Sequence, residues 1–273
     1  MTSRVPVVKA HAYGNDFLLV GESAPGASTA PQQDPQALAR TLCDRHRGIG
    51  ADGLLLFERG DRGASMRLFN ADGSRSELSG NGLRCLAAMV AREQNLQAGA
   101  TMVIETDAGS KSLTLLARDA ERYTFRAVLG QPEDIRQVAI PLGTATVTAT
   151  VLRMGNPQCV VLGPLPDGDR FQQLGPLLST HAMFPAGTNV EFAQVEAPDR
   201  VRILIWERGV GPTTSSGTGA CASAVAAAIH GDASRDADVV APGGTQRVEW
   251  REEGVYLTGW AEIVLEGEWM SRP

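Results

Sequence analysis

The sequence contains one short motif twice, and the two copies constrain the fold more than any other feature. The motif is Ser79-Gly80-Asn81-Gly82 in the first half and Ser216-Gly217-Thr218-Gly219 in the second. Each copy follows a polar turn and opens an alanine-rich apolar run, LRCLAAMVA or ACASAVAAAIH. The first N–H groups of a helix lack intrahelical acceptors and carry partial positive charge. Since a single Gly-x-Gly usually marks only a turn, the repetition predicts two helix starts that hold one small carboxylate ligand from opposite sides.

The elements around the two motifs also repeat. Both halves show strand, turn, strand, helix, strand, polar turn, motif and helix, in that order. Residues 34–46 predict a helix with Asp34 as N-cap, and further helices are expected from about Leu83 to Gln94 and over residues 171–184. Alternating apolar residues elsewhere predict antiparallel strands. We therefore predict an α/β (α+β) protein of two similar domains facing a shared cleft. The expected limits are 1–118 and 119–273, with the strand at about 260–273 a candidate to return to the first domain.

Composition excludes several classes of protein. The net charge is −6 and no basic cluster is visible, so nucleic acid is not an expected partner. No apolar run reaches the roughly 18 residues of a membrane span. The N-terminus lacks the apolar core of a signal peptide, which predicts a cytoplasmic protein. The four cysteines are scattered, with no pair or histidine at zinc-ligand spacing, so we expect buried free thiols and no metal site.

Six segments resemble the diaminopimelate epimerases along essentially the whole chain. They are KAHAYGNDF, RHRGIGADG, NADGSRSELSGNGLRC, GNPQ, GTNVEF and ERGVGPTTSSGTGAC. The resemblance implies two pseudo-symmetric domains, each a β-barrel-like sheet around a central helix, with the active site in the cleft between them. It also implies a homodimer, a small-molecule amino-acid substrate and no cofactor. The implied reaction interconverts LL- and meso-diaminopimelate, a lysine and peptidoglycan precursor, by removal and return of the α-proton.

The resemblance also implies roles for individual residues. Family members use one cysteine as a thiolate to remove the α-proton and a second as a thiol to return one; Ser79 and Ser216 occupy those two positions here. Four residues at the helix starts would donate to the α-carboxylate: Gly80, Asn81, Gly217 and Thr218. The distal end of the substrate would be held by Asn15, Asn70, Asn156, Asn189 and Arg208. Glu207 would contact the amino group.

The two serines depart from the family at the chemistry itself. A serine hydroxyl is a far weaker acid than a thiol and needs an adjacent base. The histidine that the family places beside a catalytic thiol is replaced by Gln158, and Glu207 is the one ionisable candidate that we identify near either serine. Cys85 and Cys221 lie a turn or more inside the predicted helices, so we expect them, like Arg84, to be structural.

Three functions therefore remain open. The chain is a working epimerase of the diaminopimelate type, an isomerase or dehydratase acting on a related amino or imino acid, or a catalytically silent amino-acid-binding protein. Deliberate replacement of two cysteines is a further explanation, against which Gln158 argues. Each asparagine alone has a simpler interpretation, since asparagine in a Gly-Asn turn commonly adopts the left-handed conformation or bonds its own backbone. Arg208 alone would fit a surface pair with Glu207 that contributes little. Because all of the substrate-holding residues are present together, the epimerase of the diaminopimelate type is favoured.

Overall fold

The structure is a computed structural model that describes residues 3–22, 34–61 and 63–271. The chain forms two compact units: unit 1 contains residues 1–127 and 260–273, and unit 2 contains residues 128–259. The chain passes from unit 1 to unit 2 within strand β8 (Arg122–Gly130) and returns within the long strand β17 (Gly254–Ser271). The domain limit that we expect between residues 118 and 119 stays a prediction about folding domains.

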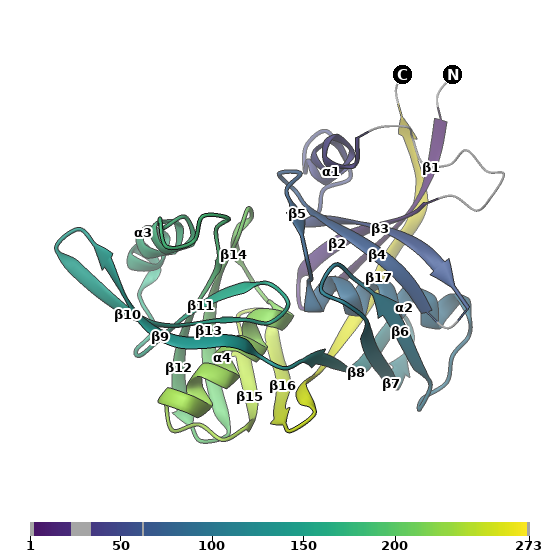
Figure 1. Ribbon diagram of the computed structural model, residues 1–273. Coiled ribbons are helices and arrows are strands. Elements are labelled where there is room, and N and C mark those ends of the chain that lie inside the picture. Colours follow the sequence, from purple (N-terminus) through teal and green to yellow (C-terminus); the bar gives the residue numbers. More distant parts are fainter. Residues whose placement is uncertain (1–2, 23–33, 62, 272–273) are drawn as a thin grey trace. The chain divides into compact units, whose positions relative to one another are not determined.

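Each unit has its own set of elements (Figure 1). Besides its parts of β8 and β17, unit 1 contains β1 (Ser3–Ala12), β2 (Asn15–Gly21), α1 (Pro35–Cys43), β3 (Gly53–Gly60), β4 (Gly63–Asn70), β5 (Arg75–Ser76), α2 (Gly80–Glu93), β6 (Thr101–Glu105) and β7 (Lys111–Asp119). Unit 2 contains β9 (Glu133–Leu142), β10 (Ala145–Arg153), β11 (Pro157–Leu162), α3 (Gly168–Ser179), β12 (Asn189–Ala197), β13 (Arg200–Glu207), β14 (Gly211–Thr213), α4 (Gly217–His230), β15 (Asp236–Ala241) and β16 (Gly244–Arg251).

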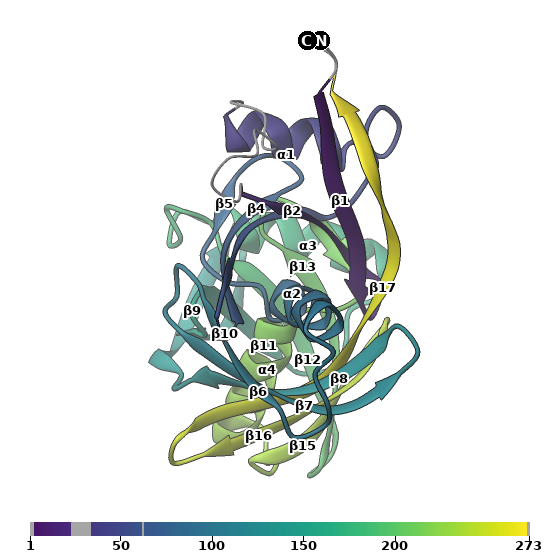
Figure 2. The same ribbon diagram turned by 90° about the vertical axis from the view of Figure 1, so that its right-hand side faces the viewer.

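Unit 1 is a barrel built around helix α2. The ring of pairings runs through β1, β2, β3, β4, β6, β7, β8 and β17 and closes when β17 pairs with β1. Every residue of α2 from Gly80 to Ala91 is buried. A helix that is covered on all sides must lie in a core, and Figure 2 shows α2 inside the curve of β1, β2 and β4.

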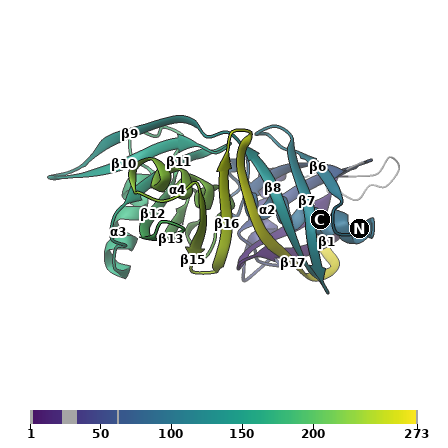
Figure 3. The same cartoon turned by 90° about the horizontal axis from the view of Figure 1, so that it is seen from below.

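Unit 2 repeats this plan around helix α4. The parallel pairs β2–β3 and β4–β6 of unit 1 correspond to the parallel pairs β11–β12 and β13–β15. In both units a helix, α1 or α3, connects the first parallel pair, as parallel strands require. Helix α4 is buried from Gly217 to Ala227 and contacts β10, β11, β12, β13, β15 and β16. The β9–β10 hairpin extends beyond the rest of the unit (Figure 3). The predicted fold class is confirmed.

The strand register identifies equivalent positions in the two units. Phe17 lies opposite Gly53 in the β2–β3 pair, and Gln158 lies opposite Asn189 in the β11–β12 pair. The third residues of β3 and β12, Leu55 and Glu191, are therefore equivalent. In the same way, Asn70 ends β4 and Glu207 ends β13.

All three helices with stated expected limits differ in the structure, and α1 ends at Cys43 rather than at residue 46. Helix α1 begins after Asp34, whose side chain accepts a hydrogen bond from the N–H of Gln36, so its predicted N-cap is confirmed. Helix α2 begins at Gly80 rather than near Leu83, because Ser79 caps it and the motif itself forms the first turn. Helix α3 covers residues 168–179 instead of 171–184, because Asp167 caps it earlier. Both outer helices pack on their own unit through apolar clusters.

Candidate active site

The two motif serines adopt the same capping geometry. Ser79 and Ser216 both have extended backbones, and each precedes the first residue of its helix. Ser79 Oγ accepts a hydrogen bond from the N–H of Gly82 at 3.1 Å, and Ser216 Oγ accepts one from Gly219 at 3.0 Å. Because each side chain satisfies one helix-start donor, the preceding N–H groups of Gly80, Asn81, Gly217 and Thr218 form the first turn, where helix geometry provides no acceptor.

The side chains of the two turn asparagines, Asn15 and Asn156, are buried in the protein. In both units the preceding glycine is left-handed, with φ of 87° at Gly14 and 80° at Gly155, and in unit 1 Tyr13 is left-handed as well, with φ of 56°. Glycine adopts this region without a steric cost, so Asn15 and Asn156 keep ordinary backbones and are buried. The simpler interpretation of these asparagines as left-handed turn residues is therefore wrong.

In unit 1 the inward side chains form a chain of hydrogen bonds leading to the α2 start. Asn15 donates to Asp52 at 2.8 Å and accepts from the Asn81 side-chain amide at 3.0 Å. The Asn81 oxygen accepts in turn from the Arg84 guanidinium. The two predicted binding residues Asn15 and Asn81 are thus held in place by each other and by Arg84. Asn70 lies at the end of β4 and donates to Ser74 Oγ at 2.9 Å.

Arg84 is the largest fully buried side chain among the described residues. Its guanidinium lies 5.8 Å from the centre of the Tyr13 ring, within the range of a cation–π interaction. Burial raises the pKa of Tyr13, and the Arg84 charge opposes that shift. Arg84 lies one turn inside α2, which begins at Gly80, and places a buried positive charge below the Ser79 helix start.

Asp16 belongs to an ion cluster rather than to a simple hairpin turn. It pairs with Lys9 at 3.0 Å and with Arg45 at 2.9 Å, and Arg45 also reaches Asp52 at 2.8 Å. Burial alone would raise the pKa of Asp16, but the hydrogen bonds from Arg45 and Lys9 prevail and hold it below its usual value. The cluster fixes Asp52, which in turn orients Asn15.

In unit 2 a network of amides surrounds Gln158. The N–H of Arg208 donates to Asn189 Oδ1 at 2.9 Å, so the other end of the Asn189 amide is its NH₂ group. That NH₂ lies 3.2 Å from Gln158, which orients the Gln158 oxygen toward it. The same oxygen accepts from Thr218 Oγ1 at 3.1 Å. Asn156 adjoins this network, because its side-chain amide lies 3.4 Å from Thr218 Oγ1.

This orientation directs the Gln158 nitrogen at Glu191, a residue that the sequence analysis missed. The nitrogen donates to the two Glu191 oxygens at 3.0 and 3.3 Å. Glu191 is 0% exposed, and burial, assisted by the nearby Glu207 charge, raises its pKa well above the usual value. A signal was present in the sequence: Glu191 stands between apolar neighbours in the buried strand segment Val190–Ala193, where an acid without a role is costly.

Glu191 also lies directly behind the Ser216 helix start. A methyl group added to Gly219 would lie 2.5 Å from Glu191 Oε1 and 3.0 Å from Ser216 Oγ. The carboxyl group and the hydroxyl group therefore border the same small space. Only glycine leaves that space open. Glu207 is thus not the sole acid near a serine, which corrects the sequence-based expectation.

The remaining predicted binding residues of unit 2 lie at the end of β13. Glu207 is the last residue of that strand, and its charge adds to the burial that raises the pKa of Glu191. The Arg208 guanidinium donates to the carbonyl oxygen of Ala186 at 3.3 Å. Its backbone N–H donates to Asn189 Oδ1, so the Asn189 side chain is held in place by the Arg208 backbone.

All four cysteines are buried, and none of them forms a disulfide. Burial raises the pKa of Cys43 to about 12 and that of Cys159 to about 12, and it also raises the pKa of Cys85. A thiol must ionise to act as a nucleophile or base. Cys85 and Cys221 are both fully buried within α2 and α4, as expected for packing residues inside the helices.

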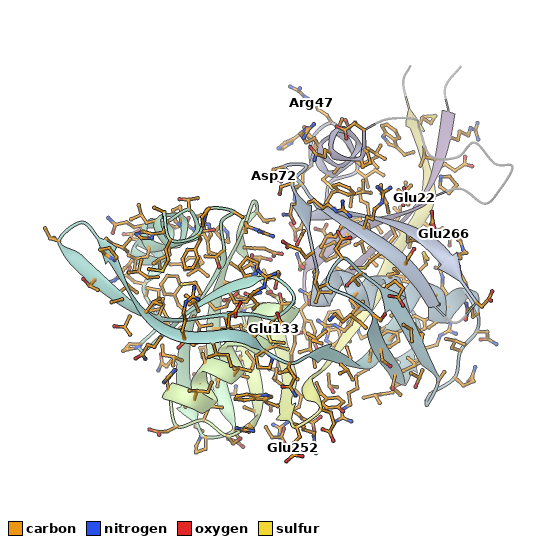
Figure 4. The ribbon with its side chains drawn as sticks, in the orientation of Figure 1. Glu22, Arg47, Asp72, Glu133, Glu252 and Glu266 are labelled. Atoms are coloured by element: carbon orange, nitrogen blue, oxygen red, sulfur yellow. The ribbon has the colours of Figure 1, made fainter. Side chains whose placement is uncertain are left out.

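A cavity of about 430 Å³ in unit 1 lies away from the predicted site residues. It is bordered by β1, β2, β3, α2 and β17, and Figure 4 labels two of its lining residues, Glu22 and Glu266. Its lining includes none of the predicted site residues. Within the described residues, no helix combines the length and the apolar character that crossing a membrane requires.

The comparisons with known proteins agree with the geometry. The family described as diaminopimelate epimerase matches residues 7–132 and 150–264. A diaminopimelate epimerase from Desulforudis audaxviator is 42% identical over 282 residues, covering 96% of this chain and 98% of that protein. A chloroplastic diaminopimelate epimerase from Oryza sativa subsp. japonica is 37% identical, covering 95% of this chain and 78% of that protein.

Solved structures show the same fold at low identity. A hydroxyproline epimerase from Agrobacterium vitis, crystallised with trans-4-hydroxy-L-proline, superposes with a TM-score of 0.75 at 16% identity, covering 98% of this chain and 92% of that chain. A predicted epimerase from Pseudomonas aeruginosa gives 0.74 at 14% identity, covering 98% and 100%. The match of the family and the identity to its curated members decide the assignment. This chain belongs to the diaminopimelate epimerase family.

Proposed function

We propose that this chain is a diaminopimelate epimerase-type isomerase that interconverts LL- and meso-diaminopimelate without a cofactor. The observation that carries the proposal is the duplicated helix start, with a capping serine at each copy and inward-facing amides around it. Inversion at one carbon requires a proton to leave one face and another to arrive at the opposite face. Two equivalent helix starts, one from each unit, would supply both faces of one ligand.

The helix starts explain how the α-proton can be removed. When the C–H bond breaks, its electron pair spreads into the α-carboxylate, whose negative charge grows. The N–H groups of Gly80, Asn81, Gly217 and Thr218, with the helix dipoles behind them, stabilise that charge. Ser79 and Ser216 exchange the protons. Each serine must pass on or regain its own hydroxyl proton, so each depends on the charges behind it.

The distal end of the substrate has a separate set of partners. In this proposal Asn15, Asn70, Asn156, Asn189 and Arg208 hold the amino and carboxylate groups far from the reacting carbon, and Glu207 receives the nearer amino group. Arg208 suits a carboxylate because a guanidinium can donate two parallel hydrogen bonds. The homodimer that the resemblance implies and the cytoplasmic location predicted above belong to the same proposal. Light scattering of the purified protein tests the dimer.

The proposed reaction is tested with LL-diaminopimelate in D₂O. We expect deuterium at an α-carbon by mass spectrometry and formation of the meso isomer by chiral chromatography. Ser79→Ala and Ser216→Ala should abolish both signals. Ser223→Ala, the same change two turns further along α4, should leave them intact. Binding of diaminopimelate without any deuterium uptake would overturn the isomerase and favour an amino-acid-binding protein.

A further inference from the structure

Glu191 is a buried acid with no role in the mechanism described so far. It lies in the centre of unit 2, receives hydrogen bonds from Gln158, and borders the same small space as Ser216 Oγ. The equivalent position in unit 1 is Leu55, whose methyl groups lie 3.5 Å from a methyl group added to Gly82. The corresponding space is thus lined by a carboxyl group in one unit and by an apolar side chain in the other.

A carboxyl group behind a serine hydroxyl can give that serine a proton and take it back. Serine ionises far less readily than cysteine and transfers protons only when a neighbouring group holds a proton for it. We propose that Glu191 is the positioning residue that supplies and recovers the proton of Ser216. This inference rests on the proposed function, since it assigns the proton source for one face of that reaction.

The proton transfer balances once solvent is included: the proton that Ser79 takes from the opposite face is released to water, and Glu191 regains one from water. Glu191 begins as a neutral acid. As the Ser216 Oγ–H bond breaks and its proton forms the new C–H bond on the α-carbon, the Glu191 Oε–H proton moves to Ser216 Oγ. Glu191 is left as a carboxylate and regains a proton from water. The reverse reaction moves the same protons in the opposite order.

The surroundings of Glu191 favour its neutral form. Burial, with the adjacent Glu207, raises the pKa of Glu191. A proton donor that works near neutral pH needs such a raised pKa. The other titratable neighbour is Cys159 on β11, whose thiol stays protonated because burial raises its pKa to about 12. The Gln158 amide is neutral, so it orients the carboxyl group without ionising it.

The first test is the rate of α-proton exchange in Glu191→Gln. The control is Glu196→Gln, the same change on the same strand, where the glutamate forms surface pairs with Arg200 and Arg202. We expect kcat to fall about 100-fold or more in Glu191→Gln with KM changed less than about twofold, while Glu196→Gln retains the parent rate. Glu191→Asp should restore part of kcat, and the high-pH limb of the rate profile should disappear in Glu191→Gln. An unchanged kcat, or equal changes in kcat and KM with no change in the pH profile, would overturn the proposal.

A second test does not depend on turnover. In Ser216→Cys, the thiol is titrated by its thiolate absorbance, with and without Glu191→Gln; Ser79→Cys serves as the matched site in unit 1. Since a carboxylate nearby disfavours a second negative charge, Glu191→Gln should lower the pKa of the thiol at position 216 and leave that at position 79 unchanged. A thiol at position 216 that titrates identically in both backgrounds refutes the proton coupling. If the parent protein shows no turnover, the proposed reaction fails, and this titration still decides the inference.

Discussion

The two helix starts share a backbone design but differ in the charge buried behind them. Ser79 and Ser216 cap their helices identically. Behind the α2 start lie apolar Leu55 and the buried cation Arg84, whereas behind the α4 start lies the buried acid Glu191. A nearby cation favours the ionised form of an acid, and a nearby carboxyl group favours the protonated form. In the proposed reaction this difference would favour Ser79 as the proton acceptor and Ser216 as the proton donor.

Replacing both serines with cysteine should have the largest effect. Sulfur changes the size of the side chain little but its acidity greatly. We expect Ser79→Cys with Ser216→Cys to raise LL-to-meso conversion by about 100-fold or more, measured by chiral chromatography, with each single variant below the double. Adding Gln158→His should raise the rate further and move its pH profile downward. A triple variant that binds diaminopimelate without exchanging its α-proton would show that the residues around Ser79 and Ser216 do not form an epimerase site.

The same cysteine variants test the charge difference directly. The thiol at position 79 should titrate at a lower pKa than the thiol at position 216, because Arg84 lies behind one and Glu191 behind the other. Thiolate absorbance against pH measures both. Equal pKa values would mean that the buried charges do not reach the serines.

Removing the buried cation should destabilise unit 1. Arg84→Met keeps most of the side-chain volume but deletes the hydrogen bond to Asn81 and the contact with the Tyr13 ring. We expect a loss of about 1–3 kcal/mol in the free energy of unfolding, because the Asn81 oxygen is left buried without its donor, measured by urea denaturation. The comparison variant is Arg118→Met, which loses a cation–π contact at the surface and should cost under about 1 kcal/mol. Similar costs for the two variants would contradict a structural role for the buried charge.

The glycines three residues after each serine should respond differently to alanine. A methyl group on Gly219 meets Glu191 Oε1 at 2.5 Å, whereas one on Gly82 meets no atom nearer than 3.4 Å. Gly219→Ala should therefore cost about 1–3 kcal/mol of stability. Gly82→Ala should be neutral or stabilising by up to about 1 kcal/mol, because alanine favours the helix. Urea denaturation of the pair provides the measurement, and equal effects would show that Glu191 does not occupy that space.

The smallest expected effect is on the pH dependence of stability. Because the folded-state pKa of Glu191 is raised, the folded state binds the proton more tightly than the unfolded state. Stability from this group is present below the unfolded glutamate pKa and is lost as pH rises toward the folded value. Glu191→Gln should remove that loss, so its melting temperature relative to the parent should be higher at pH 8 than at pH 5. A difference that does not vary with pH would indicate that Glu191 has an ordinary pKa.

Local patterns predicted a large part of the fold and of the candidate site. The Ser-Gly-x-Gly motifs form helix starts because the capping hydrogen bond joins residues only three positions apart, and the apolar run that follows forms a helix buried on all sides. Alternation predicted strands, and the repeated order of elements predicted two similar units. The helix limits were less accurate, since Ser79 and Asp167 begin their helices earlier than the apolar pattern does.

Other features depended on contacts between residues far apart in the sequence. Nothing local to Glu191 shows that strand β12 places it behind Gly219, and nothing local to Asp16 shows that Lys9 and Arg45 both reach it. The family motifs identified Gln158 as a departure, but only the packing of β11 beside β12 shows that its amide serves a buried acid. By itself, therefore, the sequence determined the two serine-capped helix starts, because their hydrogen bonds lie within one turn of the chain. Which charge lies behind each copy was decided by tertiary structure, because burial and strand pairing bring distant residues together and alter their acidity.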